Sequence, residues 1–158
     1  MTALPALGLA ALAALAASAC AHRPAPALAP SLEVEAFMHA YTEAWNRHDH
    51  VAIARDFYRT GPPLEAQTAS LAQTFEGLRA QGYVRSDIQE IRGCATGRDE
   101  AGLETAWAGM KFSRLTASGE PLPPRDRASA YDLKKFADGW RITRLSGHDA
   151  SRPLACPG

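Results

Sequence analysis

The sequence predicts an α+β domain in which three N-terminal helices precede an antiparallel sheet of about four strands. Apolar residues recur at helical spacing as far as Gly82, and beyond it the period changes to the alternation that is typical of strands. The helical segments come before the strands instead of alternating with them. This order excludes a parallel sheet built from βαβ units.

An uncharged apolar run opens the chain at residues 3–20 and ends in Ala17-Ser18-Ala19-Cys20. The run is shorter than the ~20 apolar residues of a membrane span, so we expect residues 1–19 to be a cleaved signal peptide. The small residues before Cys20 resemble a bacterial lipobox, although Ala-Ser-Ala also suits an ordinary signal peptidase. We favour an exported protein that is lipid-anchored through Cys20 on the periplasmic side of the cell envelope. It would be secreted if Cys20 is not modified.

The rest of the chain has the usual size of one domain with one core. Residues 20–30 contain three prolines, so we expect an extended tether there, followed by a domain at 31–148 and a tail at 149–158. Lys and Arg together number 17, as do Asp and Glu, and the formal net charge is zero. Such a chain has no basic field for a nucleic acid, and contact with a membrane is expected only through a lipid anchor.

Two cysteines remain once Cys20 is assigned to lipidation. Cys94 and Cys156 form an even pair in a domain that is expected to be exported, which favours a disulfide between them. Two buried or free thiols are the alternative.

The first helix begins after Ser31, a suitable N-cap. Its apolar stripe consists of Val34, Phe37, Met38, Tyr41 and Trp45. Asp49 is expected to cap a second, short helix that buries Val51, Ala54, Phe57 and Tyr58. The two helices should pack as a hairpin.

A third helix is expected between the break at residues 60–63 and Gly82. The first strand follows, and a change of parity at Ile91 indicates a bulge or bend. Further strands are expected at Leu103–Leu115, Arg127–Phe136 and Trp140–Ser146. The last two form a hairpin closed by Asp138-Gly139, because Asp-Gly is a strong turn signal.

Two motifs resemble those of a known superfamily. Phe37-x-x-x-Tyr41-x-x-Ala44-Trp45-Asn46-x-x-Asp49 is similar to the opening helices of NTF2-like (SnoaL-like, cystatin-like cone) proteins, and Tyr131-Asp132-Leu133-x-x-Phe136-x-Asp138-Gly139-Trp140 is similar to their closing hairpin. The resemblance covers residues 32–146. It implies a strongly curved antiparallel sheet wrapped around helices, with a conical apolar pocket between them.

The resemblance also implies a candidate catalytic pair. Tyr41 and Asp132 fall where ketosteroid isomerases of the superfamily keep their two oxyanion-hole donors. Those enzymes carry a general base between the second and third helices, but residues 59–63 of this chain contain no carboxylate. Asp56 or Glu65 would have to replace it.

Both residues have plainer interpretations. Tyr41 lies on the core stripe of its helix, where a tyrosine usually packs and finds a local hydrogen bond. Asp132 can form an ion pair with Lys134 or Arg141, and strand parity alone does not show which face is the pocket. His48, Asp49 and His50, like His148 and Asp149, lack the spacing of metal ligands. We therefore expect no metal and no cofactor.

Two function classes follow. The favoured class is a non-catalytic envelope module that binds a small apolar molecule or a partner protein, with a homodimer through the sheet as a further expectation. The alternative is a ketosteroid-isomerase-like or polyketide-cyclase-like enzyme that uses Tyr41 and Asp132 as oxyanion-hole donors. In either class, the aromatic and sulfur side chains expected to line the pocket are those of Phe37, Trp45, Trp107, Met110 and Phe112.

Overall fold

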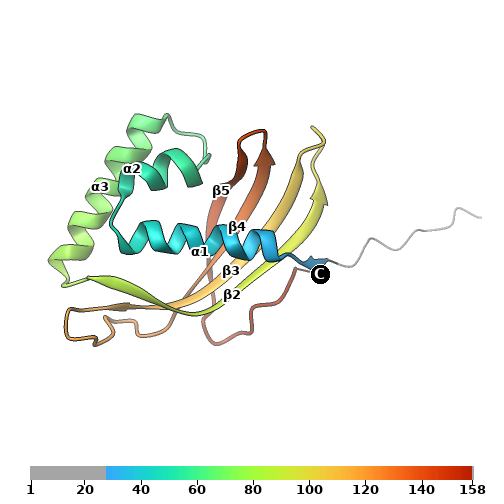
Figure 1. The fold of residues 1–158 in the computed structure, drawn as a ribbon. Helices are drawn as coiled ribbons and strands as arrows, with labels where there is room; N and C mark the ends of the chain where they lie inside the picture. Colours follow the sequence, from blue (N-terminus) through green and yellow to red (C-terminus); the bar gives the residue numbers. More distant parts are fainter. Residues whose placement is uncertain (1–27, 158) are drawn as a thin grey trace, which may run out of the picture.

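The computed structural model describes residues 28–157 of the chain. Within this range it contains one antiparallel sheet in the order β1-β2-β3-β4-β5, with helices packed against one face (Figure 1). The strands are β1 (Ala29–Pro30), β2 (Arg85–Arg98), β3 (Glu104–Leu115), β4 (Arg127–Phe136) and β5 (Gly139–His148). The predicted α+β class, with helices before strands, is confirmed.

The sheet has five strands instead of about four. The additional strand is β1, in which Ala29 pairs with Ala95 and Pro30 with Cys94. It lies in the segment expected to be a tether only. Proline is compatible with this position because an edge strand can leave one row of backbone groups unpaired.

The helices are α1 (Leu32–Asn46), a short α2 (His50–Ala52) that continues into the π-helical turn η1 (Ile53–Phe57), and α3 (Leu64–Ala80). Both predicted caps are present. Ser31 Oγ accepts a hydrogen bond from the Val34 amide at 3.4 Å, and Asp49 Oδ1 accepts one from the Ala52 amide at 3.0 Å. Each cap therefore satisfies a backbone donor that the first turn of its helix leaves free.

The inner face of the sheet, defined here as the face that α1 covers, carries the core. Val34 and Met38 of α1 are fully buried, and Tyr41 is 2% exposed. The backbones come closest at Gly93, where the Ser31 amide donates to the Gly93 carbonyl at 2.8 Å and Glu35 Oε1 accepts from the Gly93 amide at 3.1 Å. Helix α1 is thus hydrogen-bonded directly to β2.

Three irregularities bend the sheet. The register of β2 against β3 shifts between Ile88 and Glu90 and again between Ala95 and Gly97, and β4 shifts against β5 after Asp132. The first shift accounts for the parity change that the sequence shows before Ile91. Because a bulge adds local twist and bend to a strand, these shifts help the sheet to curve around the helices.

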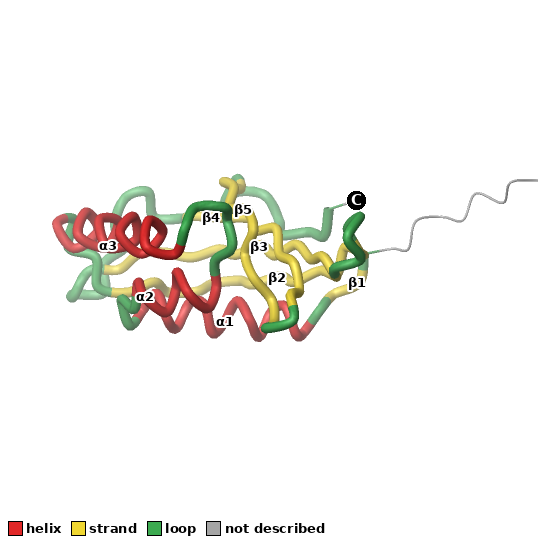
Figure 2. The backbone as a smooth tube through the Cα atoms, turned by 90° about the horizontal axis from the view of Figure 1, so that it is seen from above, coloured by secondary structure: helices red, strands yellow, loops and turns green. Residues whose placement is uncertain are grey.

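The C-terminal tail lies against the outer face, which is the face opposite the helices. A disulfide joins Cys94 of β2 to Cys156. Leu154 is 5% exposed and lies beside Gly109 and Trp107 of β3. The start of β1 and the C-terminus consequently lie at the same end of the molecule, as Figures 1 and 2 both show.

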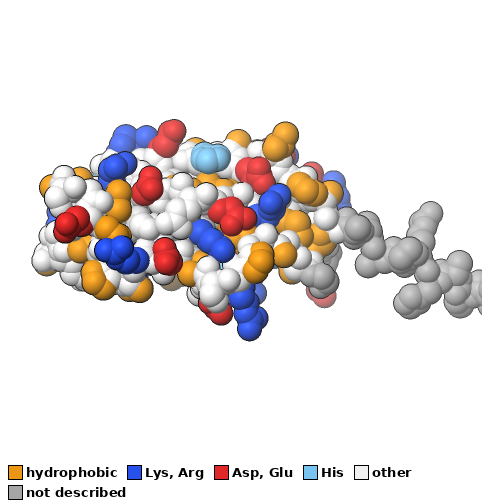
Figure 3. All heavy atoms as spheres, turned by 90° about the horizontal axis from the view of Figure 1, so that it is seen from below, with side chains coloured by type: hydrophobic (Ala, Val, Ile, Leu, Met, Phe, Trp, Pro, Cys, Tyr) orange, Lys and Arg blue, Asp and Glu red, His pale blue; other side chains and the backbone are white. Residues whose placement is uncertain are grey.

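Charged side chains of both signs are interspersed on the face drawn in Figure 3, without a large basic area. That distribution agrees with the zero net charge of the chain. None of the described helices is long and apolar enough to cross a membrane.

Replacing Gly93 with Ala should lower the free energy of unfolding by about 1–3 kcal/mol, because a Cβ there would lie 2.9 Å from Ser31 O and from Val34 Cβ. Gly147→Ala is the matched control, since a Cβ at Gly147 meets nothing within 4 Å. Urea denaturation of both variants measures the difference. Equal stabilities would contradict the close approach of α1 to β2.

Removal of the disulfide should destabilise the domain by about 4 kcal/mol, because the bond closes a loop with a sequence separation of 62 residues. Cys94→Ser/Cys156→Ser and the wild-type chain would be compared by thermal and urea unfolding. Thiol titration of the non-reduced chain adds a direct check, in which reactivity of both Cys94 and Cys156 would refute the bond.

Candidate functional site

A cavity of about 270 Å³ lies between the helices and the inner face of the sheet. Helices α1 and α3 supply Trp45 and Leu71, and the sheet supplies Ile88, Met110, Phe112 and Leu145. Met110 and Phe112 alternate along β3 and so share the inner face. The cavity is therefore mainly apolar and aromatic, with polar groups at a few positions.

Three tyrosine side chains form the polar part of the wall. The hydroxyl groups of Tyr41 and Tyr58 lie 2.7 Å apart, and the Tyr131 ring packs edge-on against Tyr41 with 5.7 Å between centroids. Burial raises the pKa of all three phenols, that of Tyr41 well above its ordinary value. The hydroxyls therefore stay protonated near neutral pH. One hydroxyl of the Tyr41–Tyr58 pair donates its single proton to the other, which leaves the second hydroxyl of the pair able to donate to a ligand.

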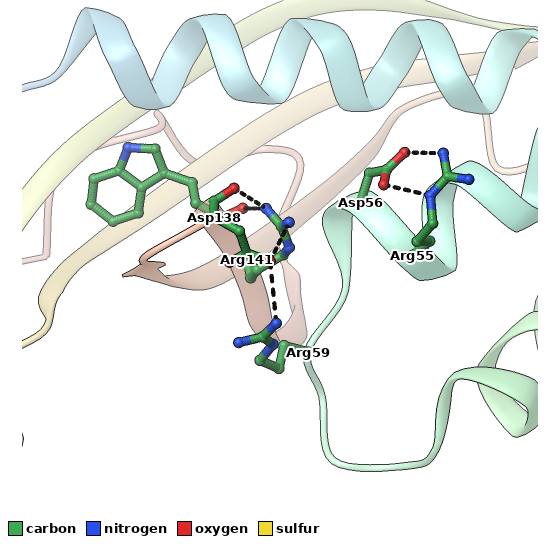
Figure 4. Close-up of polar contacts among 6 residues, drawn as sticks. Arg55, Asp56, Arg59, Asp138 and Arg141 are labelled. Carbon is green, nitrogen blue, oxygen red and sulfur yellow. Dashed lines mark hydrogen bonds and ion pairs between the residues drawn. The ribbon is translucent and has the colours of Figure 1, made fainter.

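The segment that carries Tyr58 is fastened to the β4–β5 hairpin. Tyr58 bridges to Ile142 of β5, and the Arg59 amide donates to the Ile142 carbonyl at 2.8 Å. Asp138 in the hairpin turn forms ion pairs with Arg59 at 3.4 Å and with Arg141 at 2.9 Å (Figure 4). The backbone contacts, supported by this exposed network, hold Tyr58 beside Tyr41.

Neither proposed replacement for the general base borders the cavity. Asp56 forms an ion pair with Arg55 at 2.7 Å (Figure 4), and the hydrogen bonds from Arg55 lower the pKa of its carboxyl group. Glu65 is exposed in the first turn of α3. Both carboxylates are therefore outside hydrogen-bond reach of a group bound in the cavity.

The structure does not bring Tyr41 and Asp132 together. Tyr41 lines the cavity, whereas Asp132 lies on the outer face, one position after the inward-facing Tyr131. Its carboxylate forms an ion pair with Arg144, rather than with Lys134 or Arg141, and is 42% exposed. Lys134 instead pairs with Asp99. Asp132 consequently cannot serve as the second donor to an oxyanion held by Tyr41.

The five expected lining residues divide between three places. Trp45, Met110 and Phe112 line the cavity. Trp107 lies on the outer face, in register with Asp132 and beside the C-terminal tail. Phe37 packs against Phe57 at 5.3 Å between centroids, in the core next to the cavity.

The sequence did not identify several other polar groups in the wall, namely Tyr58, Ser86, Arg114, Ser129 and Tyr131. Tyr131 is adjacent to Asp132, so a correct choice of face would have selected it. Met110, Phe112 and Arg114 occupy alternate positions of one strand, and this alternation predicts that all three side chains lie on the same face.

His48, which precedes the second helix, has a local structural role. His48 Nε2 lies 2.8 Å from the Val84 carbonyl, and its ring stacks on Tyr83. The neighbouring Asp49 is the cap of α2. Across residues 28–157, no group of three or more His, Cys, Asp or Glu side chains could hold a metal ion.

No protein-family model matches the chain, and no curated protein matches it. Several solved structures match it. Aln2 from a Streptomyces species is 15% identical with a TM-score of 0.52, and the match covers 72% of this chain and 85% of Aln2. The helical cell shape determining protein Pgp2 from Campylobacter jejuni is 12% identical with a TM-score of 0.53, and the match covers 69% of this chain and 38% of Pgp2.

A third match is an NTF2-like protein with a cystatin-like fold from Novosphingobium aromaticivorans, 21% identical with a TM-score of 0.47, covering 72% of this chain and 77% of that one. Identities this low concern the fold alone. The described chain nevertheless has the architecture that the two sequence motifs imply, with helices packed on the inner face of a bent antiparallel sheet and a cavity between them. The fold of the described chain is therefore shared with Aln2 and with part of Pgp2.

Proposed function

We propose that this chain is a non-catalytic NTF2-like module of the cell envelope that binds a small, largely apolar molecule. The observation that carries the proposal is the composition of the cavity wall. Aromatic and aliphatic side chains form most of it, and hydroxyl groups of Tyr41, Tyr58 and Tyr131 provide hydrogen bonds. Ligand sites generally combine an apolar wall with a few placed polar groups in this way.

The size of the cavity supports a small ligand. Its volume of about 270 Å³ is just below the range of ~300–1,000 Å³ that is common for small-molecule sites. A molecule with one or two fused rings, or a short acyl chain, is of suitable size. The aromatic rings of Trp45 and Phe112 offer it stacking and edge contacts.

A binding role is favoured over proton transfer because of the groups that line the cavity. The described lining contains no carboxylate and no imidazole, so it offers no ordinary general base within reach of a bound carbon acid. The tyrosine hydroxyls are kept neutral by burial and act as hydrogen-bond donors. The isomerase-like alternative also required Asp132 as an oxyanion-hole donor beside Tyr41, and the outward position of Asp132 does not support that role.

The envelope location rests on the N-terminal sequence. Residues 1–27, including the signal-like run and Cys20, lie outside the described residues. The proposal of a lipid anchor is based on the small residues that precede Cys20. The domain then follows the anchor after a short Pro/Ala-rich segment.

Cys20→Ser should move the protein from the membrane fraction to the soluble fraction of cells that express it. The lipid chains supply the proposed attachment, and a serine cannot carry the thioether-linked lipid. Fractionation followed by intact-mass measurement tests both the location and the modification. A wild-type mature chain without added lipid mass would rule out the anchor.

Binding can be tested with the neutral fluorescent probe N-phenyl-1-naphthylamine, in a chain that carries Cys20→Ser so that no detergent is required. We expect saturable binding, and Ser129→Phe should weaken it at least tenfold because Ser129 lines the cavity and a phenyl ring would occupy it. The matched control is Ser146→Phe on β5, where the exposed side chain lies on the outer face in register with Ala130. Equal affinity in both variants, with unchanged circular dichroism, would refute binding in the cavity.

A further inference from the structure

Arg114 is a cationic group in the wall of the apolar cavity. It lies near the end of β3, on the inner face with Met110 and Phe112, and its guanidinium carbon is 6.0 Å from the Phe112 ring centroid. Among residues 28–157, no carboxylate forms an ion pair with it and its side chain makes no hydrogen bond. A positive charge at the edge of an apolar site is therefore left without a counter-ion from the described chain.

Most other basic side chains of the sheet have a carboxylate partner, and the exceptions among the described residues are Arg85, Arg92 and Arg127. Lys111 is three positions earlier on the same strand but on the outer face, where it pairs with Glu90. Lys134, Lys135 and Arg144 also pair with carboxylates. Six basic side chains of β2 to β5 have such partners, so the lack of one at Arg114 is not a general property of this sheet.

A second guanidinium adds positive charge at the same place. Arg127 is in register with Phe112, which puts it diagonally across from Arg114 on the inner face. Its Nη2 donates to the Pro123 carbonyl at 2.6 Å, and its Nε is buried with no partner in the described chain. Burial, together with the charge of Arg114, lowers the pKa of Arg127.

A hydroxyl group completes the set of donors. Ser86 of β2 is the register partner of Arg114 and also lines the cavity. Its Oγ lies 3.1 Å from the Tyr83 hydroxyl, so Tyr83 can donate to Ser86 while Ser86 donates to a bound group. A guanidinium beside a hydroxyl is well suited to an oxyanion with two or three oxygens.

From this arrangement we infer that the ligand of the cavity is an amphipathic acid, with a carboxylate-like or sulfonate-like group held by Arg114 and an apolar body among Trp45, Met110 and Phe112. This inference rests on the proposed binding function and specifies its ligand class. The anion would replace the missing counter-ion of Arg114, and the apolar body would displace solvent from the aromatic wall. A neutral ligand would leave the guanidinium uncompensated.

The inference is tested with two probes that share one apolar body. 1-Anilinonaphthalene-8-sulfonate carries a sulfonate, whereas N-phenyl-1-naphthylamine is the same body without it. Both are titrated by fluorescence into the full chain carrying Cys20→Ser. Arg114→Met, which keeps much of the length of the side chain and removes its charge, should weaken the sulfonate probe about tenfold and change the neutral probe less than twofold.

Two controls make the result specific to Arg114. Arg85→Met removes an exposed arginine next to Ser86 that does not line the cavity and has no ion pair in the described chain, and it should change neither affinity. Arg114→Lys keeps the charge and should retain part of the preference for the sulfonate probe. In the wild-type chain, added salt should weaken the sulfonate probe alone.

The outcomes separate the two proposals. If Arg114→Met affects both probes equally, or neither, the acidic ligand class is refuted while binding in the cavity stands. If the wild-type chain binds neither probe, or if Ser129→Phe leaves both affinities unchanged, the proposed function itself fails and the inference fails with it.

Discussion

Helix α1 comes this close to β2 because residue 93 has no side chain, since a Cβ there would lie 2.9 Å from Ser31 O and from Val34 Cβ. At Gly93 the helix and β2 are joined by two backbone-centred hydrogen bonds, to Ser31 and to Glu35. The packing behind this contact buries Val34 and Met38 completely.

The cavity lies beside the end of α1 that is farther from the contact with Gly93. The side chains of α1 that line it, Tyr41, Thr42 and Trp45, belong to the C-terminal half of the helix, whereas Val34 and Met38 of the N-terminal half are packed directly on the sheet. The close contact is thus at the start of the helix, and the cavity is at its end. Helix α3, through Leu71 and Thr74, closes that space instead of filling it.

Most of the fold could be predicted because its signals are local. The caps at Ser31 and Asp49, the change of period after Gly82 and the Asp138-Gly139 turn each depend on a few neighbouring residues. Strand β1 could not be predicted, since two residues have no period and their pairing depends on β2, more than sixty positions away.

The site was less predictable because it depends on which way each strand faces. Alternation places Tyr131 and Asp132 on opposite faces, and a sequence motif that contains both does not say which one enters the cavity. For the same reason, Trp107 was predicted to line the pocket with Met110 and Phe112. An odd number of positions along β3 separates Trp107 from both residues, so it lies on the opposite face. Arg114, by contrast, shares their parity and could have been found from β3 alone.

The two ends of the described chain meet beside Cys94, where β1 pairs with β2 and the disulfide holds the tail. Ser86, in the cavity wall, is eight residues earlier on β2, which corresponds to about 25 Å along the strand. The place where the two ends of the described chain meet is therefore far along β2 from this part of the cavity wall. A protein joined at either end of the described residues, 28 or 157, would lie away from Ser86, so fusion at these two positions is compatible with an open cavity.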